Sequence, residues 1–430
     1  MVSNLDLSSY LPRVVDDEID ALVAGGASAI AIEGAKAVGK SATAAQRATS
    51  TFLLEQPATR EVLQADPARI LTGGSVLIDE WQHLPATWDT VRRAVDAGAA
   101  PGQFFLTGSA SALDPGTHSG AGRILKVRMR PMSLAERGIT RPTVSLGALL
   151  GGERPTIGGA TRLGLTDYVD EIVASGFPAL RGLSDRVRRA QLRGYVERVI
   201  DRDFPEWGRQ VRNPAALHRW LVAYAAATST CAAYDVIRDA SSAGEGDKPA
   251  KSTTQPYRDT LERLYLLDPL PGWSPTRNHI RELANAPKHH LVDPALAASL
   301  LGLGAGALLH GQDGAVVIPR AGSPLGALFE SLVALSVRVY AQGCEATTSH
   351  FRTHRGEHEV DLVVERDDGK VLAIEVKLSA AVDDSDVRHL RWLGERLGDD
   401  LLDAVIVTTG SHAYRRADGV AVVPAALLGP

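Results

Sequence analysis

One stretch of the chain has the residue types and the spacing of a phosphate-binding loop. Residues 34–41 read GAKAVGKS and fit the pattern G-x-x-x-x-G-K-[ST], after an apolar run at residues 29–33 and before a helix expected at residues 41–50. The glycines allow the loop to wrap a phosphate, so that backbone N–H groups and the helix N-terminus face the anion. Such a pattern also arises by chance in glycine-rich chains, but the flanking strand and helix favour a nucleotide site.

The residues of this loop have different predicted roles. Lys40 would reach the β- and γ-phosphates, and Ser41 would hold the Mg²⁺ that accompanies a nucleotide. The other predicted nucleotide contacts come from small side chains and backbone groups of the loop and the first helical turn: Gly34, Ala35, Lys36, Ala37, Val38, Gly39 and Ala42.

Two further apolar segments end in polar residues that suit the same site. One leads into Asp79 and Glu80, and the other leads into Thr107 and Ser109. Because ligands bind at the carboxyl ends of parallel strands, we expect all four residues near the loop. Asp79 would support the Mg²⁺, Glu80 would polarise the attacking water, and Thr107 and Ser109 would sense the γ-phosphate. An acidic turn explains the carboxylates in isolation, but less well beside a phosphate loop.

A second group of reactive residue types lies near the C-terminus. Residues 360–379 read as a β-hairpin in which Glu375 and Lys377 share one face of the second strand, while Asp361 begins the first strand. Glu330 comes from a preceding helical segment. The carboxylates would bind Mg²⁺ or Mn²⁺, and Lys377 would orient or deprotonate a water that attacks a phosphodiester. The alternative is a simple Glu–Lys ion pair on an exposed sheet face.

The elements between these two groups are less distinctive. Residues 141–165 are rich in Gly, Pro and Thr and read as a linker, and residues 166–212 show helical periodicity with many arginines. Residues 217–270 read as two helices, a polar loop and a third helix running into a short strand, which resembles a winged helix-turn-helix. The third helix would expose Gln255, Tyr257 and Arg258 for DNA recognition. Docking between two larger domains is the alternative reading.

Composition sets limits on the class of protein. The 430 residues are 44% hydrophobic and 23% charged, which is ordinary for globular domains, and the formal net charge of −5 gives no overall basic character. Basic clusters are local, with four cationic residues between Arg123 and Arg130. Two cysteines exclude a disulfide framework or a zinc cluster. We expect a cytoplasmic protein with no membrane partner, since no signal peptide or membrane-spanning run is evident.

The ordered motifs resemble the bacterial and archaeal ATPase family that pairs an AAA-type domain with a C-terminal domain of unknown function 4143. The similar segments include GAKAVGKS, LIDEWQHLP, FFLTGSAS, RPMSLAERG, SGFP, APKHHLVDP, FRTHRGEHEVDLVV and IEVKLS, in this order along nearly the whole chain. The resemblance implies the ATPase roles given above for Lys40, Ser41, Asp79 and Glu80. It also implies that Arg123, in GAGR, is the arginine that faces the nucleotide.

With this resemblance, the expected fold is a multidomain α/β protein. We predict a P-loop AAA-type parallel sheet at residues 1–140, a linker and helical connector at 141–215, a winged-helix-like part at 216–285, and a restriction-endonuclease-like α/β domain at 286–430. The order helix–strand–strand–strand–helix–strand and the D…E-x-K residues suggest the last assignment.

Two functions are compatible with this organisation. In the first, ATP binding and hydrolysis control a Mg²⁺-dependent nuclease domain that acts on DNA. In the second, the protein is a nucleotide-dependent switch whose nuclease-like fold binds DNA or a protein partner without cutting. The cofactors would be ATP and Mg²⁺, with Mn²⁺ possible at the nuclease-like site, and assembly as a homo-oligomer is common among AAA proteins.

Overall fold

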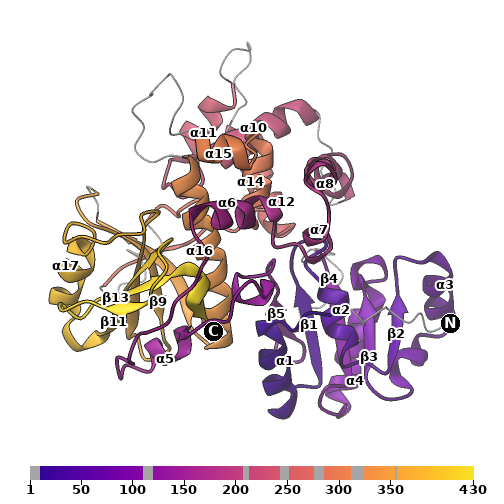
Figure 1. Ribbon diagram of the computed structural model, residues 1–430. Coiled ribbons are helices and arrows are strands. Elements are labelled where there is room, and N and C mark those ends of the chain that lie inside the picture. The colour runs from indigo at the N-terminus through magenta and orange to yellow at the C-terminus, as the bar shows by residue number, and fades with distance from the viewer. Residues whose placement is uncertain are drawn as a thin grey trace. The chain divides into compact units, whose positions relative to one another are not determined.

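The computed structural model describes residues 10–109, 120–206, 213–242, 251–275, 285–310, 324–353 and 356–430. The chain divides into two compact units (Figure 1). The first comprises residues 1–131 together with residues 263–265, and the second comprises residues 132–262 and 266–430. The four-part division expected from the sequence stays a prediction.

The first unit is built on a parallel sheet of five strands within the described residues, in the order β2-β3-β4-β1-β5. Strands β1, β3 and β4 are buried at every residue, because their apolar runs supply side chains to both faces of the sheet. The strands are β1 (Ala29–Glu33), β2 (Ser50–Leu53), β3 (Val76–Asp79), β4 (Phe104–Gly108) and β5 (Leu125–Arg128).

Helices and short 3₁₀ turns connect these strands. The helices are α1 (Val14–Ala24), α2 (Lys40–Ala45), α3 (Pro57–Ala65) and α4 (Ala86–Asp96), with 3₁₀ turns η1 (Pro67–Leu71) and η2 (Trp81–His83). Trp81 and Trp88 stack with ring centroids 4.4 Å apart inside the sheet's apolar core. Helix α2 is shorter than the predicted 41–50 helix, since the chain enters β2 at Ser50.

The second unit begins with helices. They are α5 (Leu146–Leu150), α6 (Leu165–Ala174), α7 (Pro178–Arg181), α8 (Asp185–Arg198), the π-helical turn η4 (Val199–Asp203), α9 (Phe204–Glu206), α10 (Pro214–Ala226), α11 (Tyr234–Ala240), α12 (Lys251–Arg263), α14 (Pro294–Leu300), α15 (Ala305–His310) and α16 (Pro324–Gly343). The last residue of α12, Arg263, belongs to the first unit.

Two predictions about this region were wrong. The proposed linker contains α5, whose residues Leu146 and Leu149 are fully buried, and a two-residue strand β6 (Val144–Ser145) that pairs with β14 (Leu428–Gly429). Tyr257 does not project outward from α12: it is buried and makes edge contacts with the rings of Phe204 and Trp220. Apolar packing therefore uses residues that the sequence pattern assigned to a linker and to a recognition surface.

Among the residues that the structure describes, a mixed sheet of seven strands forms the C-terminal part of the second unit, in the order β12-β13-β11-β10-β9-β8-β7. β9 and β10 are the predicted antiparallel hairpin, and β10 runs parallel to β11. The strands are β7 (Gly272–Trp273), β8 (Thr347–Arg352), β9 (Glu359–Glu365), β10 (Val371–Val376), β11 (Leu401–Thr408), β12 (Tyr414–Arg415) and β13 (Ala421–Pro424), with helix α17 (Arg388–Leu397) and 3₁₀ turns η3 (Ala135–Arg137), η5 (Gly398–Asp400) and η6 (Ala425–Leu427) elsewhere in this unit.

Helix α16 is the central helix of the second unit. It contacts α6, α14 and β8, and Phe329 and Tyr340 are fully buried on it. Among the described residues it is also the one helix long and apolar enough to cross a membrane by length and composition, with 67% of that stretch buried inside the protein. Such burial is the pattern of a core helix.

Candidate functional site

The phosphate-loop sequence forms a tight turn between β1 and α2. Gly39 stands at the N-cap of α2 with φ of 106°, and Ala37 has φ of 65°. A side chain at Gly34 would bring its Cβ within 2.1 Å of the carbonyl oxygen of Met129. Glycine is therefore required at position 39 because the backbone there is left-handed, and at position 34 because the segment after β5 approaches it closely.

Lys40 is buried within this loop. Its Nζ donates hydrogen bonds to the carbonyl oxygens of Gly34 (3.0 Å) and Ala35 (2.8 Å). Burial lowers the pKa of Lys40 to about 8, although the nearby charges of Glu80 and Asp79 favour the ammonium form. The loop thus holds a desolvated ammonium group beside its own backbone, in a position to pair with a bound phosphate.

The other predicted contacts converge on Asp79 at the carboxyl end of β3. Ser41 Oγ donates to Asp79 Oδ1 at 2.5 Å, and Thr107 Oγ1 donates to the same oxygen at 2.6 Å. Burial raises the pKa of Asp79, and these two hydrogen bonds oppose that rise. Hydroxyl groups from α2 and β4 therefore meet one carboxylate, as the strand order requires.

Glu80 lies one residue beyond the strand in a left-handed conformation, with φ of 52°. Its backbone N–H donates to Thr107 Oγ1 at 3.3 Å. Its carboxylate accepts hydrogen bonds from Ser109 Oγ (3.1 Å) and from the side-chain amide of Gln82. The structure thereby brings together Lys40, Ser41, Asp79, Glu80, Thr107 and Ser109, the functional side chains predicted around the loop.

The donor set suits a nucleotide-bound Mg²⁺. The Ser41 hydroxyl already points at a buried carboxylate oxygen of Asp79, and hydroxyl and carboxylate oxygens are the ligands that this ion prefers in proteins. Ser41 would hold the ion, and Asp79 would orient that hydroxyl and the ion's waters.

The structure does not bring Arg123 to this group. Arg123 precedes β5 at the amino-terminal edge of the sheet, where its Nε donates to Asp96 at the end of α4 (2.9 Å). The phosphate loop lies at the opposite, carboxyl-terminal edge. Arg128, the last residue of β5, and Arg130, two residues further on, lie at the carboxyl-terminal edge instead. The Arg128 guanidinium lies over the ring of Tyr265, 4.2 Å from its centroid.

Two residues beside the loop make contacts that the sequence did not predict. Arg13 is buried, and its guanidinium donates to the carbonyl oxygens of Val38 (2.9 Å) and Arg130 (2.8 Å). Glu33, the last residue of β1, accepts a hydrogen bond from Tyr265 Oη at 2.5 Å. The sequence contains no local signal for either contact, because 25 residues separate Arg13 from Val38 and 232 separate Glu33 from Tyr265.

In the second unit, the predicted carboxylates also gather. Lys377 Nζ donates to Glu375 Oε1 at 2.8 Å, and the backbone N–H of Val376 donates to Asp361 Oδ2 at 2.9 Å. Burial raises the pKa of Glu375 to about 8, and the neighbouring charge of Asp361 adds to the rise. The four predicted residues of the nuclease-like site, including Glu330 from α16, therefore belong to one connected group.

A lysine missed from the sequence occupies the middle of this group. Lys288 is only 1% exposed, and its Nζ lies 2.8 Å from Glu330 Oε1, 3.0 Å from Asp361 Oδ1 and 3.1 Å from Glu359 Oε1. Burial alone would lower its pKa, but the three carboxylates outweigh burial and raise the pKa well above the ordinary value. Within the described residues, no three His, Cys, Asp or Glu side chains are placed to hold a metal ion.

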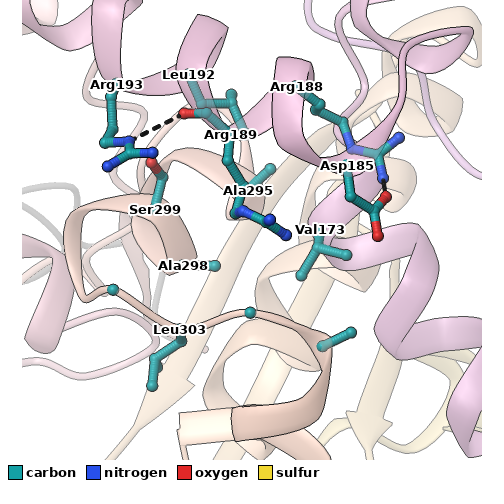
Figure 2. A pocket seen from close by; sticks show the side chains of 13 residues that line it. Val173, Asp185, Arg188, Arg189, Leu192, Arg193, Ala295, Ala298, Ser299 and Leu303 are labelled. Carbon is teal, nitrogen blue, oxygen red and sulfur yellow. Dashed lines mark hydrogen bonds and ion pairs between the residues drawn. The ribbon is translucent and has the colours of Figure 1, made fainter.

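The arginine-rich segment serves two purposes. Arg181 pairs with Glu171 at 2.9 Å, which is a structural ion pair. Arg188, which also pairs with Asp185, lines a cavity of about 260 Å³ together with Arg189 and Arg193, between α8 and the end of α14 (Figure 2). Its other lining is largely apolar: Val173, Leu192, Ala295, Ala298 and Leu303.

Comparison with known proteins assigns the parts of the chain. Residues 27–137 match a family described as an AAA domain, and residues 325–428 match a domain of unknown function (DUF4143). Residues 165–307 match a further domain of unknown function (DUF8612), which crosses the boundaries predicted at 215 and 285.

Relatives and solved structures extend along most of the chain. Uncharacterized proteins of Mycobacterium bovis and Mycobacterium tuberculosis are each 25% identical over 430 residues, which cover 99% of this chain and 84% of theirs. A Walker-type ATPase of Pyrococcus abyssi is similar over 68% of this chain and 96% of its own, with 14% identity and a TM-score of 0.38. The ORC2 protein of Aeropyrum pernix, in ADPNP and ADP complexes, is similar over 73% and 99%, with 14% identity and a TM-score of 0.30.

Proposed function

We propose that the protein binds and hydrolyses ATP in its AAA domain and uses the nucleotide state to control its second unit. The observation that carries the ATPase proposal is the convergence of Ser41 and Thr107 on Asp79 at the edge of the sheet where the phosphate loop lies. In P-loop ATPases these residue types bind the phosphates and the Mg²⁺ between β- and γ-phosphate oxygens.

The residues of the site have distinct proposed roles. The loop's N–H groups and Lys40 bind the β- and γ-phosphates, and Mg²⁺ supplies charge neutralisation when bound. Glu80 orients and polarises the attacking water, and its hydrogen bonds from Ser109 and Gln82 hold the carboxylate in place. Arg128 or Arg130 supplies positive charge to the γ-phosphate from the end of β5.

Two substitutions test the ATPase proposal. Lys40→Ala should reduce ATP hydrolysis about a hundredfold or more, because the phosphates lose a desolvated cation. Glu80→Gln should retain ATP binding while losing turnover, since its proposed role is in the chemical step. Arg69→Ala, which removes an exposed cation paired with Asp66, is the control. Undiminished turnover in Lys40→Ala would exclude this site.

For the second unit we propose the switch rather than the nuclease. The observation that favours it is the ammonium group of Lys288 between the carboxylates that a nuclease would use for Mg²⁺. In this function ATP binding changes the affinity of the second unit for DNA or for a protein partner, and DNA is the partner we would test first.

The nuclease alternative has a direct test. Supercoiled plasmid and single-stranded DNA would be incubated with Mg²⁺ or Mn²⁺, with and without ATP, using wild type and Lys377→Ala. The switch predicts DNA binding that changes with ATP, and no cleavage by either protein. Cleavage by wild type that disappears in Lys377→Ala would establish the nuclease instead.

A further inference from the structure

The ammonium group of Lys288 has a complete set of partners. A lysine ammonium carries three N–H donors, and three carboxylate oxygens, from Glu330, Asp361 and Glu359, lie within 2.8–3.1 Å of Nζ. Charge-assisted hydrogen bonds of this length are the strong class. The ammonium donates hydrogen bonds to Glu330 and Asp361 and forms an ion pair with Glu359, although its side chain is almost inaccessible to solvent.

The charges of the cluster also depend on this lysine. Four carboxylates, those of Glu330, Glu359, Asp361 and Glu375, are linked to two ammonium groups, Lys288 and Lys377. A buried carboxylate is stable only when a cation or hydrogen-bond donors compensate its charge. Lys288 contacts three of these four groups and Lys377 contacts the fourth, so these two ammonium groups are the cations of the cluster.

The backbone fixes Lys288 at this position. Its N–H donates to the carbonyl of Leu270 (2.9 Å), and its own carbonyl accepts from the N–H of Leu270 (2.8 Å). This reciprocal pair is an antiparallel bridge. On the other side, the second oxygen of Asp361 is already held by the Val376 N–H. The lysine and its main carboxylate partner are thus both anchored.

Mg²⁺ does not fit beside this arrangement. The ion needs several oxygens at about 2.0–2.1 Å in octahedral geometry. It would have to share Glu330 Oε1 and Asp361 Oδ1 with an ammonium group already within 3.0 Å of both. Two cations that close repel strongly in a buried site, so the ammonium and the metal exclude each other.

We propose that Lys288 is the resident cation of this carboxylate cluster and that it keeps divalent metal ions out. The proposal deepens the switch function, on which it rests, by giving the reason why the second unit would bind its partner without metal-dependent cleavage. It also predicts a gain: the carboxylates as placed around the ammonium are not arranged to hold a metal ion, among the described residues, and removing the ammonium should free Glu330 and Asp361 to move onto a divalent ion.

The test is Mn²⁺ binding by the full chain without nucleotide, measured by calorimetry and by the electron paramagnetic resonance signal of free Mn²⁺. Wild type should show no Mn²⁺ binding that depends on Glu330, so wild type and Glu330→Gln should behave alike. Lys288→Ala should bind one Mn²⁺ at least tenfold more tightly than wild type, and Lys288→Ala combined with Glu330→Gln should lose that gain. Lys370→Ala, a cation outside the cluster, is the matched control.

Two results would overturn the proposal. One is Mn²⁺ binding by wild type that Glu330→Gln weakens, and this comparison holds even where Lys288→Ala fails to fold. The other is folded Lys288→Ala with unchanged Mn²⁺ affinity. ATP hydrolysis by wild type is measured in parallel. Its absence would remove the ATPase proposal and leave the metal result standing, so the two failures are distinguishable.

Discussion

At the scale of single residues, Lys40 couples nucleotide binding to pH. Its folded-state pKa of about 8 means that the empty loop holds a protonated lysine below pH 8 and increasingly a neutral one above it. A polyphosphate prefers the protonated form, so ATP affinity should be constant below pH 8 and should fall by up to about tenfold per pH unit above it. Calorimetry at pH 7 and 9 would measure this fall.

Proton uptake supplies the check on that prediction. At pH 9, ATP binding should take up close to one proton per site, which is measured by comparing binding heats in buffers of different ionisation enthalpy. At pH 7 the uptake from Lys40 should vanish. An affinity that does not change between pH 7 and 9 would mean that the loop keeps its lysine charged without the nucleotide.

Residues near each other in the sequence were predictable, and residues far apart were not. Lys40 and Ser41 lie in one contiguous pattern, and Asp79 ends an evident strand. Lys288 is 42 residues from Glu330 and 73 from Asp361, and the sequence marks it only as a lysine before two histidines. Its role depends on a tertiary contact between separate elements, which no local pattern records.

At the scale of elements, the phosphate loop is packed directly against the chain that follows β5. A methyl group at Gly34 would lie 2.1 Å from the Met129 carbonyl oxygen, so either the loop or that segment must move. Gly34→Ala should therefore destabilise the first unit by about 1–3 kcal/mol and weaken ATP binding as well. Denaturant unfolding and nucleotide titration would measure the two effects.

A matched glycine is available as the control for this substitution. Gly182 follows α7, and a Cβ there would meet no heavy atom within 4 Å. Gly182→Ala should leave both the stability and the ATP affinity nearly unchanged. Equal behaviour of the two variants would show that close packing at Gly34 is not what fixes the loop.

Of the five strands that the structure describes in the parallel sheet, the sequence predicts the three inner ones, and it does not predict the edge strands β2 and β5. β1, β3 and β4 are continuous apolar runs, which buried parallel strands typically show. β2 and β5 have four residues each and contain Ser50, Thr51, Lys126 and Arg128; the first two positions of β5 are exposed, and three of the four in β2 are half-buried. An edge strand is covered by protein on fewer sides than an inner strand, so its sequence does not need a continuous apolar run. Its extended conformation is decided by hydrogen bonding to the neighbouring inner strand, which the local sequence does not show.

At the scale of the whole molecule, stability against acid depends on buried histidines in the second unit. Burial lowers the pKa of His350 to about 4, and it also lowers the pKa of His289 and His290. Below the pKa of about 6.5 that a histidine has in the unfolded chain, these histidines are protonated in the unfolded chain but stay neutral in the folded protein. Each histidine therefore costs stability as the pH falls from 6.5 toward its folded pKa.

Two glutamates of the carboxylate cluster act with the opposite sign, whereas Asp361, whose pKa is lowered, loses stability on acidification as the histidines do. Glu330 and Glu375 have pKa values raised to about 8, so their contribution is fully present below pH 4.5 and is lost as the pH rises to 8. On acidification from pH 7 to 5 the glutamates add stability while the histidines remove it. The total change is then a difference of opposing contributions, and a single pH curve cannot separate them.

A variant comparison separates the histidine contribution. His350→Gln keeps a hydrogen-bonding side chain but cannot titrate. The free energy of unfolding of wild type relative to this variant should therefore decrease by about 2 kcal/mol between pH 7 and pH 5. The glutamate contribution is common to both proteins and cancels. His218→Gln, at an exposed position of α10, is the matched control. A constant lead for wild type over His350→Gln would mean that the folded protein protonates His350 as readily as the unfolded chain does.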